Sequence, residues 1–338
     1  MLTVIVRRLL LAIPTLLALT ALLFFSVTTI LGTPATMMLG EDASPKAIAE
    51  LNARYGFDRP AHVQYFDWLG RALTGDFGRS YTSQDPVGAA IAGALPVTLE
   101  LSAWAILLAV LAAVGLNSLP NMPALRRLVG LGNLVGITMP NFILGIALIF
   151  LFSVELGWLP TTGWVPWSEG VLAHLRHMIM PVLTLSAYYF GAFSLVYRAE
   201  FSDVQQRLYI RTARAKGLSP ARVAYKHALP NAILPVITFA GLSMGHLTGG
   251  AVVTETVFSM PGVGRLFVAA IAGRDFPIML AVGMVVVVGV VIMNLIADIL
   301  YCVIDPRMDL RGPTRRGLSS RLRFGKMPQA SVSESPTT

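Results

Sequence analysis

The chain has 338 residues, of which 55% are hydrophobic and only 13% are charged, a composition that excludes an ordinary soluble globular domain. Its formal net charge is +8, and its single cysteine excludes an intrachain disulfide. The composition predicts a membrane protein with several bilayer spans.

Six hydrophobic runs approach the ~20 residues that a helix needs to cross a bilayer core. They cover residues 9–31, 98–116, 128–153, 180–197, 231–252 and 277–304. We therefore expect an all-α polytopic protein with six transmembrane helices in contact with membrane lipid. The first run is longer than the apolar core of a signal peptide, so we expect an uncleaved first span.

The distribution of Lys and Arg predicts the orientation of these spans, because cytoplasmic segments are enriched in both. Basic residues gather before the first span, between the fourth and fifth spans, and after the last one. Both termini are therefore expected in the cytoplasm, and the positive charge is interpreted as an orientation signal with no nucleic-acid partner. The expected parts are an N-terminal segment with the first span (1–31), an extracytoplasmic segment (32–97), a core of five spans (98–304) and a basic, disordered tail (305–338).

The extracytoplasmic segment has the pattern of short amphipathic helices. Ser44 and Pro45 are suited to the N-cap and first position of a helix that Gly56 can end. A second amphipathic stretch begins near Arg59 and includes Trp68. The pattern favours two helices lying on the outer membrane face, and it also suits a docking collar for an extracytoplasmic partner.

The fifth and sixth spans contain small and polar residues at helical spacing. Gly241, Gly245 and Gly249 recur every fourth residue, a stripe that lets helices approach closely in lipid. Asn294 and Asp298 share one face of the last span, where a helix-packing hydrogen bond is favoured over a role in the solute pathway.

The histidines give little indication of a metal site. His174 and His177 are three residues apart and can share a helical face, but two such residues are a weak signal. His246 stands alone in the fifth span. We expect no bound metal and no cofactor.

The polar, basic insert between the fourth and fifth spans, residues 199–230, has the pattern of helix, tight turn and helix. Val204, Leu208 and Ala215 are expected on one side of the first helix. Gly217 suits the left-handed position after that helix, and Ser219 can cap the next helix. Pro220 suits the first position of that second helix, and Pro230 is expected to stop it from running straight into the fifth span.

This insert resembles the EAA loop of ABC importer permeases, whose pattern is Glu-Ala-Ala, three residues, Gly, nine residues, Ile, one residue and Leu-Pro. Ala213, Gly217, Leu229 and Pro230 match that spacing. The departures from the pattern are Arg211 for Glu, Thr212 for the first Ala and His227 for Ile.

Further motifs are similar to the branch that imports dipeptides, oligopeptides and nickel, and the resemblance covers nearly all of residues 1–311. They are residues 211–218 (RTARAKGL), 75–80 (GDFGRS) with Pro86 and Val87, 254–259 (TETVFS), 261–265 (PGVGR), 274–277 (RDFP), Asn294-Leu295 with Asp298, and 305–307 (DPR). One departure is 32–34 (GTP), where the branch usually has Pro-Gly-Asp-Pro. A second is the short outer segment 154–177, in which some relatives have a long insertion.

The resemblance implies a type I ABC importer permease in the cytoplasmic (inner) membrane of a prokaryote. Two such permease chains, usually a related but distinct pair, form the pathway, two ABC ATPase subunits grip the EAA helices, and an extracytoplasmic solute-binding protein delivers the cargo. It implies no catalytic residue in this chain, since the partner subunits hydrolyse ATP. The implied ATPase contact comprises Ala213, Arg214, Ala215, Lys216, Gly217, Leu218, Ser219 and Pro220.

Other classes of membrane protein fit the sequence less well. A secondary transporter tends to show inverted repeats and paired intramembrane charges, and an intramembrane enzyme needs a catalytic motif; neither feature is evident in this sequence. A purely structural subunit leaves the EAA-like insert without a role. For the solute, peptides are favoured, with nickel or a nickel chelate and glutathione-like peptides as alternatives.

Overall fold

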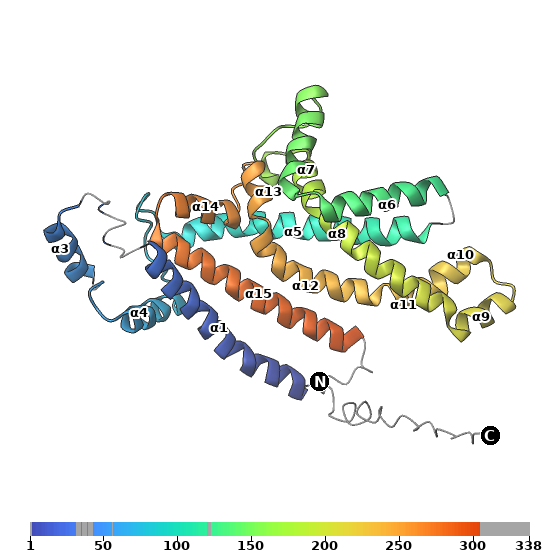
Figure 1. The fold of residues 1–338 in the computed structure, drawn as a ribbon, viewed down its shortest axis with the longest axis horizontal. Coiled ribbons are helices and arrows are strands. Elements are labelled where there is room, and N and C mark those ends of the chain that lie inside the picture. Colours follow the sequence, from blue (N-terminus) through green and yellow to red (C-terminus); the bar gives the residue numbers. More distant parts are fainter. Residues whose placement is uncertain are drawn as a thin grey trace, which may run out of the picture.

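The computed structural model describes residues 2–31, 35, 39, 43–55, 57–119 and 123–304 (Figure 1). Across these residues the chain is helical, and the only β feature is an isolated antiparallel bridge between Arg79 and Pro86. The all-α prediction is confirmed. Gly56 and the tail, 305–338, lie outside the described residues, so the predictions for them remain predictions.

Long helices form the body, and shorter ones lie at its two ends and on one side. The long helices are α1 (Leu2–Leu31), α5 (Val87–Ser118), α8 (Val171–Gln206), α12 (Leu234–Gly250) and α15 (Phe276–Ile304). The others are α3 (Pro45–Tyr55), α4 (Ala61–Leu73), α6 (Pro123–Thr138), α7 (Asn141–Leu148), η1 (Ile149–Glu155), η2 (Trp167–Glu169), α9 (Leu208–Ala215), α10 (Pro220–Arg222), η3 (Val223–Ala228), α11 (Leu229–Ala232), α13 (Val252–Val257) and α14 (Val263–Ala272).

The candidate membrane spans agree with the six predicted hydrophobic runs, although two of them are bent. In the described chain, α1, α5, α8 and α15 are each long and apolar enough to cross a membrane alone. Two bent helix pairs raise the number to as many as six. The third predicted span bends by 118° between Thr138 and Asn141, because Pro140 lacks an N–H and disfavours helical backbone at Met139.

The second bent pair lies where the basic insert enters the fifth span. The helical stretch from Pro220 to Ala232 meets α12 at 43°. Ile233 marks the break, and a proline follows it at the start of α12. The bend thus comes three residues after Pro230, which the chain accommodates within α11.

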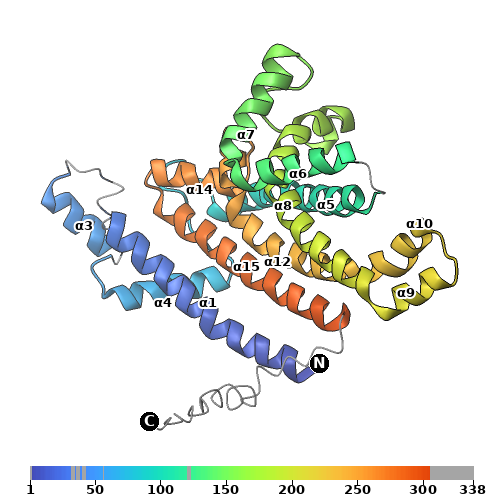
Figure 2. The same cartoon turned by 45° about the vertical axis from the view of Figure 1, so that its right-hand side comes forward.

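The two ends of the helical body carry different elements (Figure 1). The N-terminus, α9 and α10 lie toward one end, called here the α9–α10 end. Helices α3, α4 and α14 lie toward the opposite end, called the α4–α14 end. Helix α6 packs along α8, whereas α7 and η1 rise away from the body in both views (Figure 2).

The core has two parts, each built around one pair of long helices. In the first part, α5 and α8 pack along their lengths, with Leu101, Phe193 and Tyr197 fully buried. In the second, α1 lies beside α15, as both views show (Figure 2). The contact between α1 and α15 is close, since a Cβ on Gly283 would lie 2.6 Å from a methyl of Leu23.

Small residues also bring α12 close to α15. A Cβ on Gly241 would lie 3.4 Å from that of Ala297, and one on Gly245 would lie 3.3 Å from that of Met293. The side chain of Asn294 is half-buried at this same contact. Gly249 and Asp298 belong to α12 and α15, but their surroundings lie outside what the structure describes.

The segment 43–97 forms the two predicted short helices. The Ser44 hydroxyl accepts the N–H of Ala47 at 3.2 Å, so it caps α3 as expected. Helix α4 packs against the first span, because Tyr65 is buried and its hydroxyl donates to the Leu17 carbonyl at 3.1 Å. This helix is therefore part of the body.

Candidate functional site

The basic insert has the predicted turn between two helices. Helix α9 ends at Ala215, and Gly217 follows with a φ of +75°, the left-handed conformation that suits glycine. The Ser219 hydroxyl then accepts the N–H of Arg222 at 3.4 Å, with Pro220 in the first turn of the next helix. The insert thus projects as a compact hairpin at the α9–α10 end (Figure 1).

The three apolar residues expected on one side of the first helix do not share a side. Val204 is buried as expected, but Leu208 is 78% exposed and Ala215 is also exposed. The prediction assumed one continuous helix, whereas α8 ends at Gln206 and α9 restarts at Leu208 after an extended Arg207, which rotates the buried face. The residues that anchor the hairpin in the core are Ile210, Ala213, Val223 and Ala228.

The solvent side of the hairpin is basic. The side chains of Arg211, Arg214, Lys216 and Arg222 are exposed, and none makes a salt bridge with another described residue. Arg214 donates to the side-chain oxygen of Gln205, which holds its guanidinium beside α8. The hairpin therefore offers a firmly anchored surface of positive charge at the end of the body.

The TETVFS and PGVGR motifs meet around a buried carboxylate, a role that was not predicted from the sequence. Glu255 is fully buried, and its carboxylate accepts the Thr98 hydroxyl at 2.6 Å and the N–H of Arg265 at 3.0 Å. The Thr98 oxygen accepts the N–H of Val263 at 2.8 Å. Glu255 and Thr98 together satisfy N–H groups at the start of α14, where negative charge is favourable.

The glycines of the PGVGR motif make room for this arrangement. A Cβ on Gly262 would overlap the Glu255 carboxylate, and one on Gly264 would lie 2.6 Å from the Cα of Val252. Burial raises the pKa of the Glu255 carboxyl, while the hydrogen bonds from Thr98, Arg265 and Gly264 partly oppose that shift. The motif thus fastens α13, α14 and α5 together.

The GDFGRS and RDFP motifs meet at a second buried carboxylate. Asp275 is 2% exposed and accepts the Ser80 hydroxyl and the N–H groups of Tyr81 (3.2 Å) and Thr82 (3.3 Å). The N–H of Ile278 lies 3.5 Å from the same carboxylate, so Asp275 also caps α15. The loop before α5 is therefore tied to the start of α15.

A Ser80→Ala substitution is expected to loosen this loop, because it removes the hydroxyl that donates to Asp275 and accepts the N–H of Ser83. Tryptic cleavage after Arg79 should then speed up roughly fivefold for each ~1 kcal/mol of local stability lost. The control is Ser83→Ala, which removes a hydroxyl in the same loop whose one hydrogen bond among the described residues is from the N–H of Asp85, at 3.3 Å. Equal cleavage of the two variants would contradict the assigned role of Ser80.

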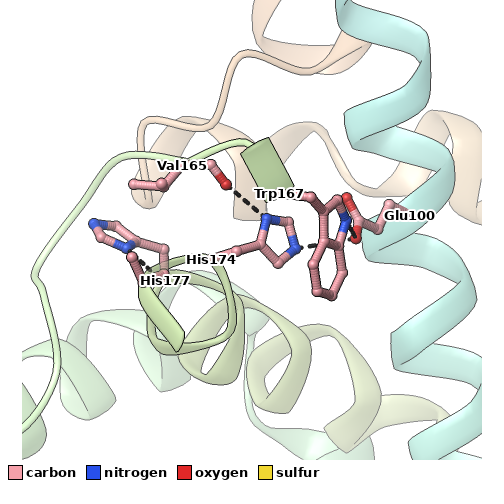
Figure 3. Close-up of polar contacts among 6 residues, drawn as sticks. Glu100, Val165, Trp167, His174 and His177 are labelled. Carbon is pink, nitrogen blue, oxygen red and sulfur yellow. Dashed lines mark hydrogen bonds and ion pairs between the residues drawn. The ribbon is translucent and has the colours of Figure 1, made fainter. Parts of the chain in front are cut away.

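His174 forms a third polar cluster with Glu100 and Trp167 (Figure 3). Its Nδ1 lies 2.6 Å from the Val165 carbonyl and its Nε2 lies 3.0 Å from the Glu100 carboxylate, which also accepts the indole N–H of Trp167 at 2.8 Å. The histidine and indole rings stack at 3.9 Å. His174 thus joins η2 and α8 to α5.

His177 takes no part in this cluster, since its Nδ1 lies 2.8 Å from the carbonyl of Ala173 in its own helix (Figure 3). Within the described residues, no group of three or more His, Cys, Asp or Glu side chains is arranged to hold a metal ion. The contacts of His174 were not predictable from the sequence, because Glu100 and Val165 belong to other elements.

Two family descriptions match the chain. Residues 105–310 match the binding-protein-dependent transport system inner membrane component, and residues 1–102 match the N-terminal membrane component of such systems. Similar proteins include the glutathione transport system permease protein GsiC of Salmonella choleraesuis (strain SC-B67), 39% identical over 90% of this chain and 98% of the relative. GsiC of Escherichia coli (strain K12) is 38% identical over the same shares.

A chain of the crystal structure of an amino acid ABC transporter with histidines aligns with a TM-score of 0.47 and 15% identity, over 65% of this chain and 94% of that one. The family matches together cover the helical body and the basic hairpin. The chain belongs to the family of binding-protein-dependent transport system inner membrane components, and it is a multi-pass protein of the inner membrane.

Proposed function

We propose that this chain is the permease subunit of an ATP-driven ABC importer for short peptides, with glutathione-like peptides as the first candidates. The observation that supports the proposal most strongly is the identity of 39% over 90% of the chain to permeases named for glutathione transport. Family membership supports a transport component rather than a catalytic subunit.

The hairpin of residues 199–230 is the proposed contact with the ATPase. Its buried side is anchored in the core by Ile210 and Ala213, so a push on its solvent side moves α8 and α12 with it. Within the proposed contact, 213–220, Arg214 and Lys216 are exposed and available to acidic or polar groups of the partner. This role places the α9–α10 end and both termini in the cytoplasm.

The proposed assembly contains a second, homologous permease chain, two ABC ATPase subunits and an extracytoplasmic solute-binding protein. The family's dependence on a binding protein supports the last of these. The chain needs no ATPase site of its own in this assembly. Gly241, Gly245 and Gly249 are proposed to serve helix packing, and Asn294 and Asp298 to serve packing or the pathway.

Uptake measurements test the proposed solute. A deletion strain should take up labelled glutathione more slowly than its parent, with recovery when the intact gene is supplied. Labelled dipeptides and Ni²⁺ are measured in parallel, in cells without a redundant uptake system. Loss of dipeptide uptake alone would exclude glutathione-like peptides as the main cargo, and loss of Ni²⁺ uptake alone would overturn peptide import.

The Gly217→Val variant is expected to abolish ATP-driven uptake while the protein still reaches the membrane. Placing a β-branched residue in the left-handed conformation costs roughly 1–2 kcal/mol. We expect the turn to change its conformation to avoid this cost, which alters the proposed contact surface. Uptake and co-purification of the ATPase subunits are the measurements.

Gly157→Val is the matched control for this substitution. Gly157 has a φ of +62°, and a Cβ at either glycine would meet open space, so the backbone strain is similar. Gly157 lies beyond η1, far along the chain from the hairpin. If both variants transported equally well, the hairpin would not be the coupling element.

A further inference from the structure

A cavity of about 750 Å³ lies beside the basic hairpin, between four separate parts of the chain. Its walls come from the end of α5, the first turns of α6, the last third of α8, and the hairpin elements from α9 to η3. This volume is within the ~300–1,000 Å³ typical of sites for small molecules. It lies at the α9–α10 end, which we place in the cytoplasm.

Three arginines from three different helices line this cavity. Arg126 belongs to α6, Arg198 to α8 and Arg214 to α9. No Asp or Glu is among the lining residues. The side chains of Arg126 and Arg198 make no hydrogen bond or ion pair with any residue that the structure describes. The cavity therefore gathers positive charge that its own walls do not balance.

The rest of the wall divides into a polar part and an apolar part. Ser202 and Gln205 supply neutral polar groups near the arginines. Tyr197 and Val223 are buried and give an apolar floor, and the Tyr197 hydroxyl is already paired with Ser118. Such a cavity suits a ligand with an anionic group that the guanidinium groups bind and a part that can lie against apolar side chains.

We propose that this cavity is a binding site for a phosphate-bearing anion. A guanidinium presents planar, paired N–H donors that match phosphate oxygens, and phosphate can accept from several arginines at once. The source is either the headgroup of an anionic phospholipid or a soluble cytoplasmic phosphate compound. Because the arginines come from α6, α8 and α9, a bound phosphate would connect the hairpin to α6 and α8. The proposed transport function does not require this connection.

Native mass spectrometry of the purified full-length chain tests this site. The protein in neutral detergent is titrated separately with phosphatidylglycerol, with phosphatidylcholine of the same acyl chains, and with inorganic pyrophosphate. We expect Arg126→Gln/Arg198→Gln to weaken binding of the anionic probe by at least about tenfold, since each substitution removes a charge-assisted contact. Arg214 is left unchanged because it belongs to the proposed ATPase contact.

Arg127→Gln is the matched control, because Arg127 is exposed on the same helix, next to Arg126, and does not line the cavity. Arg126→Gln alone is a second variant, should the double substitution reduce the yield of monodisperse protein. If the Arg126 variants lose binding of phosphatidylglycerol more than of pyrophosphate, the source is a lipid headgroup. If they lose binding of pyrophosphate more, the source is a soluble phosphate compound. Equal binding by the control and the Arg126 variants, or no binding of either anionic probe to the unaltered protein, would overturn the proposal.

Discussion

A Gly136→Ala substitution is expected to destabilise the protein at the upper end of the ~1–3 kcal/mol that overpacking costs. Helices α6 and α8 pack closely at this glycine, where a Cβ would lie 2.9 Å from the carbonyl carbon of Ala187 and closer still to its oxygen. The obstacle is backbone, so no side-chain rotation relieves it. The measurement is the apparent melting temperature and the yield of monodisperse protein from membranes.

Gly130→Ala provides the comparison within the same helix. A Cβ at Gly130 meets nothing within 4 Å, and alanine favours helix over glycine by roughly 0.5–1 kcal/mol. This variant should therefore be as stable as the unaltered chain or slightly more stable. Similar losses at both positions would mean that helix propensity, and not the contact with α8, governs stability in α6.

A Glu255→Ala substitution is also expected to destabilise the protein strongly, because it removes the carboxylate that connects α13 and α14 to α5. It leaves the Thr98 hydroxyl and the N–H of Arg265 without their acceptor in a buried site, at a cost on the order of 1–3 kcal/mol for each. Thermal unfolding of the purified protein and uptake by cells are the measurements.

Two other substitutions sharpen this result. Glu255→Gln retains a side-chain oxygen for the N–H of Arg265 and should lose less stability. Glu169→Ala removes an exposed carboxylate from η2 and should change stability by less than about 0.5 kcal/mol. If Glu255→Ala behaved like Glu169→Ala, the buried carboxylate would not be holding these helices.

Features that depend on neighbouring residues were predictable from the sequence. The hydrophobic runs located the spans, because a bilayer imposes a minimum length on an apolar helix. Gly217 and Ser219 predicted the turn and cap of the hairpin, because each acts on backbone within three residues. The TETVFS and RDFP motifs stand out in the sequence, but the contacts that they make in the fold do not.

Features that depend on distant residues or on helix direction were not predictable. Glu255 meets Thr98 across 157 residues, and nothing local marks the two as partners. Residues 128–153 form one hydrophobic run, and nothing in its hydropathy indicates that the helix axis turns by 118° at Pro140. The extended Arg207 rotates α9 relative to α8, so the prediction that Leu208 shares one side of a helix with Val204 was wrong.

The hydrogen bond between Ser80 and Asp275 cannot form until late in the synthesis of the chain. Asp275 is 195 residues downstream of Ser80, so at about 5–20 residues per second the loop waits roughly 10–40 seconds for its acceptor. Helix α1 waits for α15 as well, since these two helices pack together. A chain that stops before Asp275 therefore leaves the Ser80 hydroxyl without its acceptor and α1 without its partner helix at the same time.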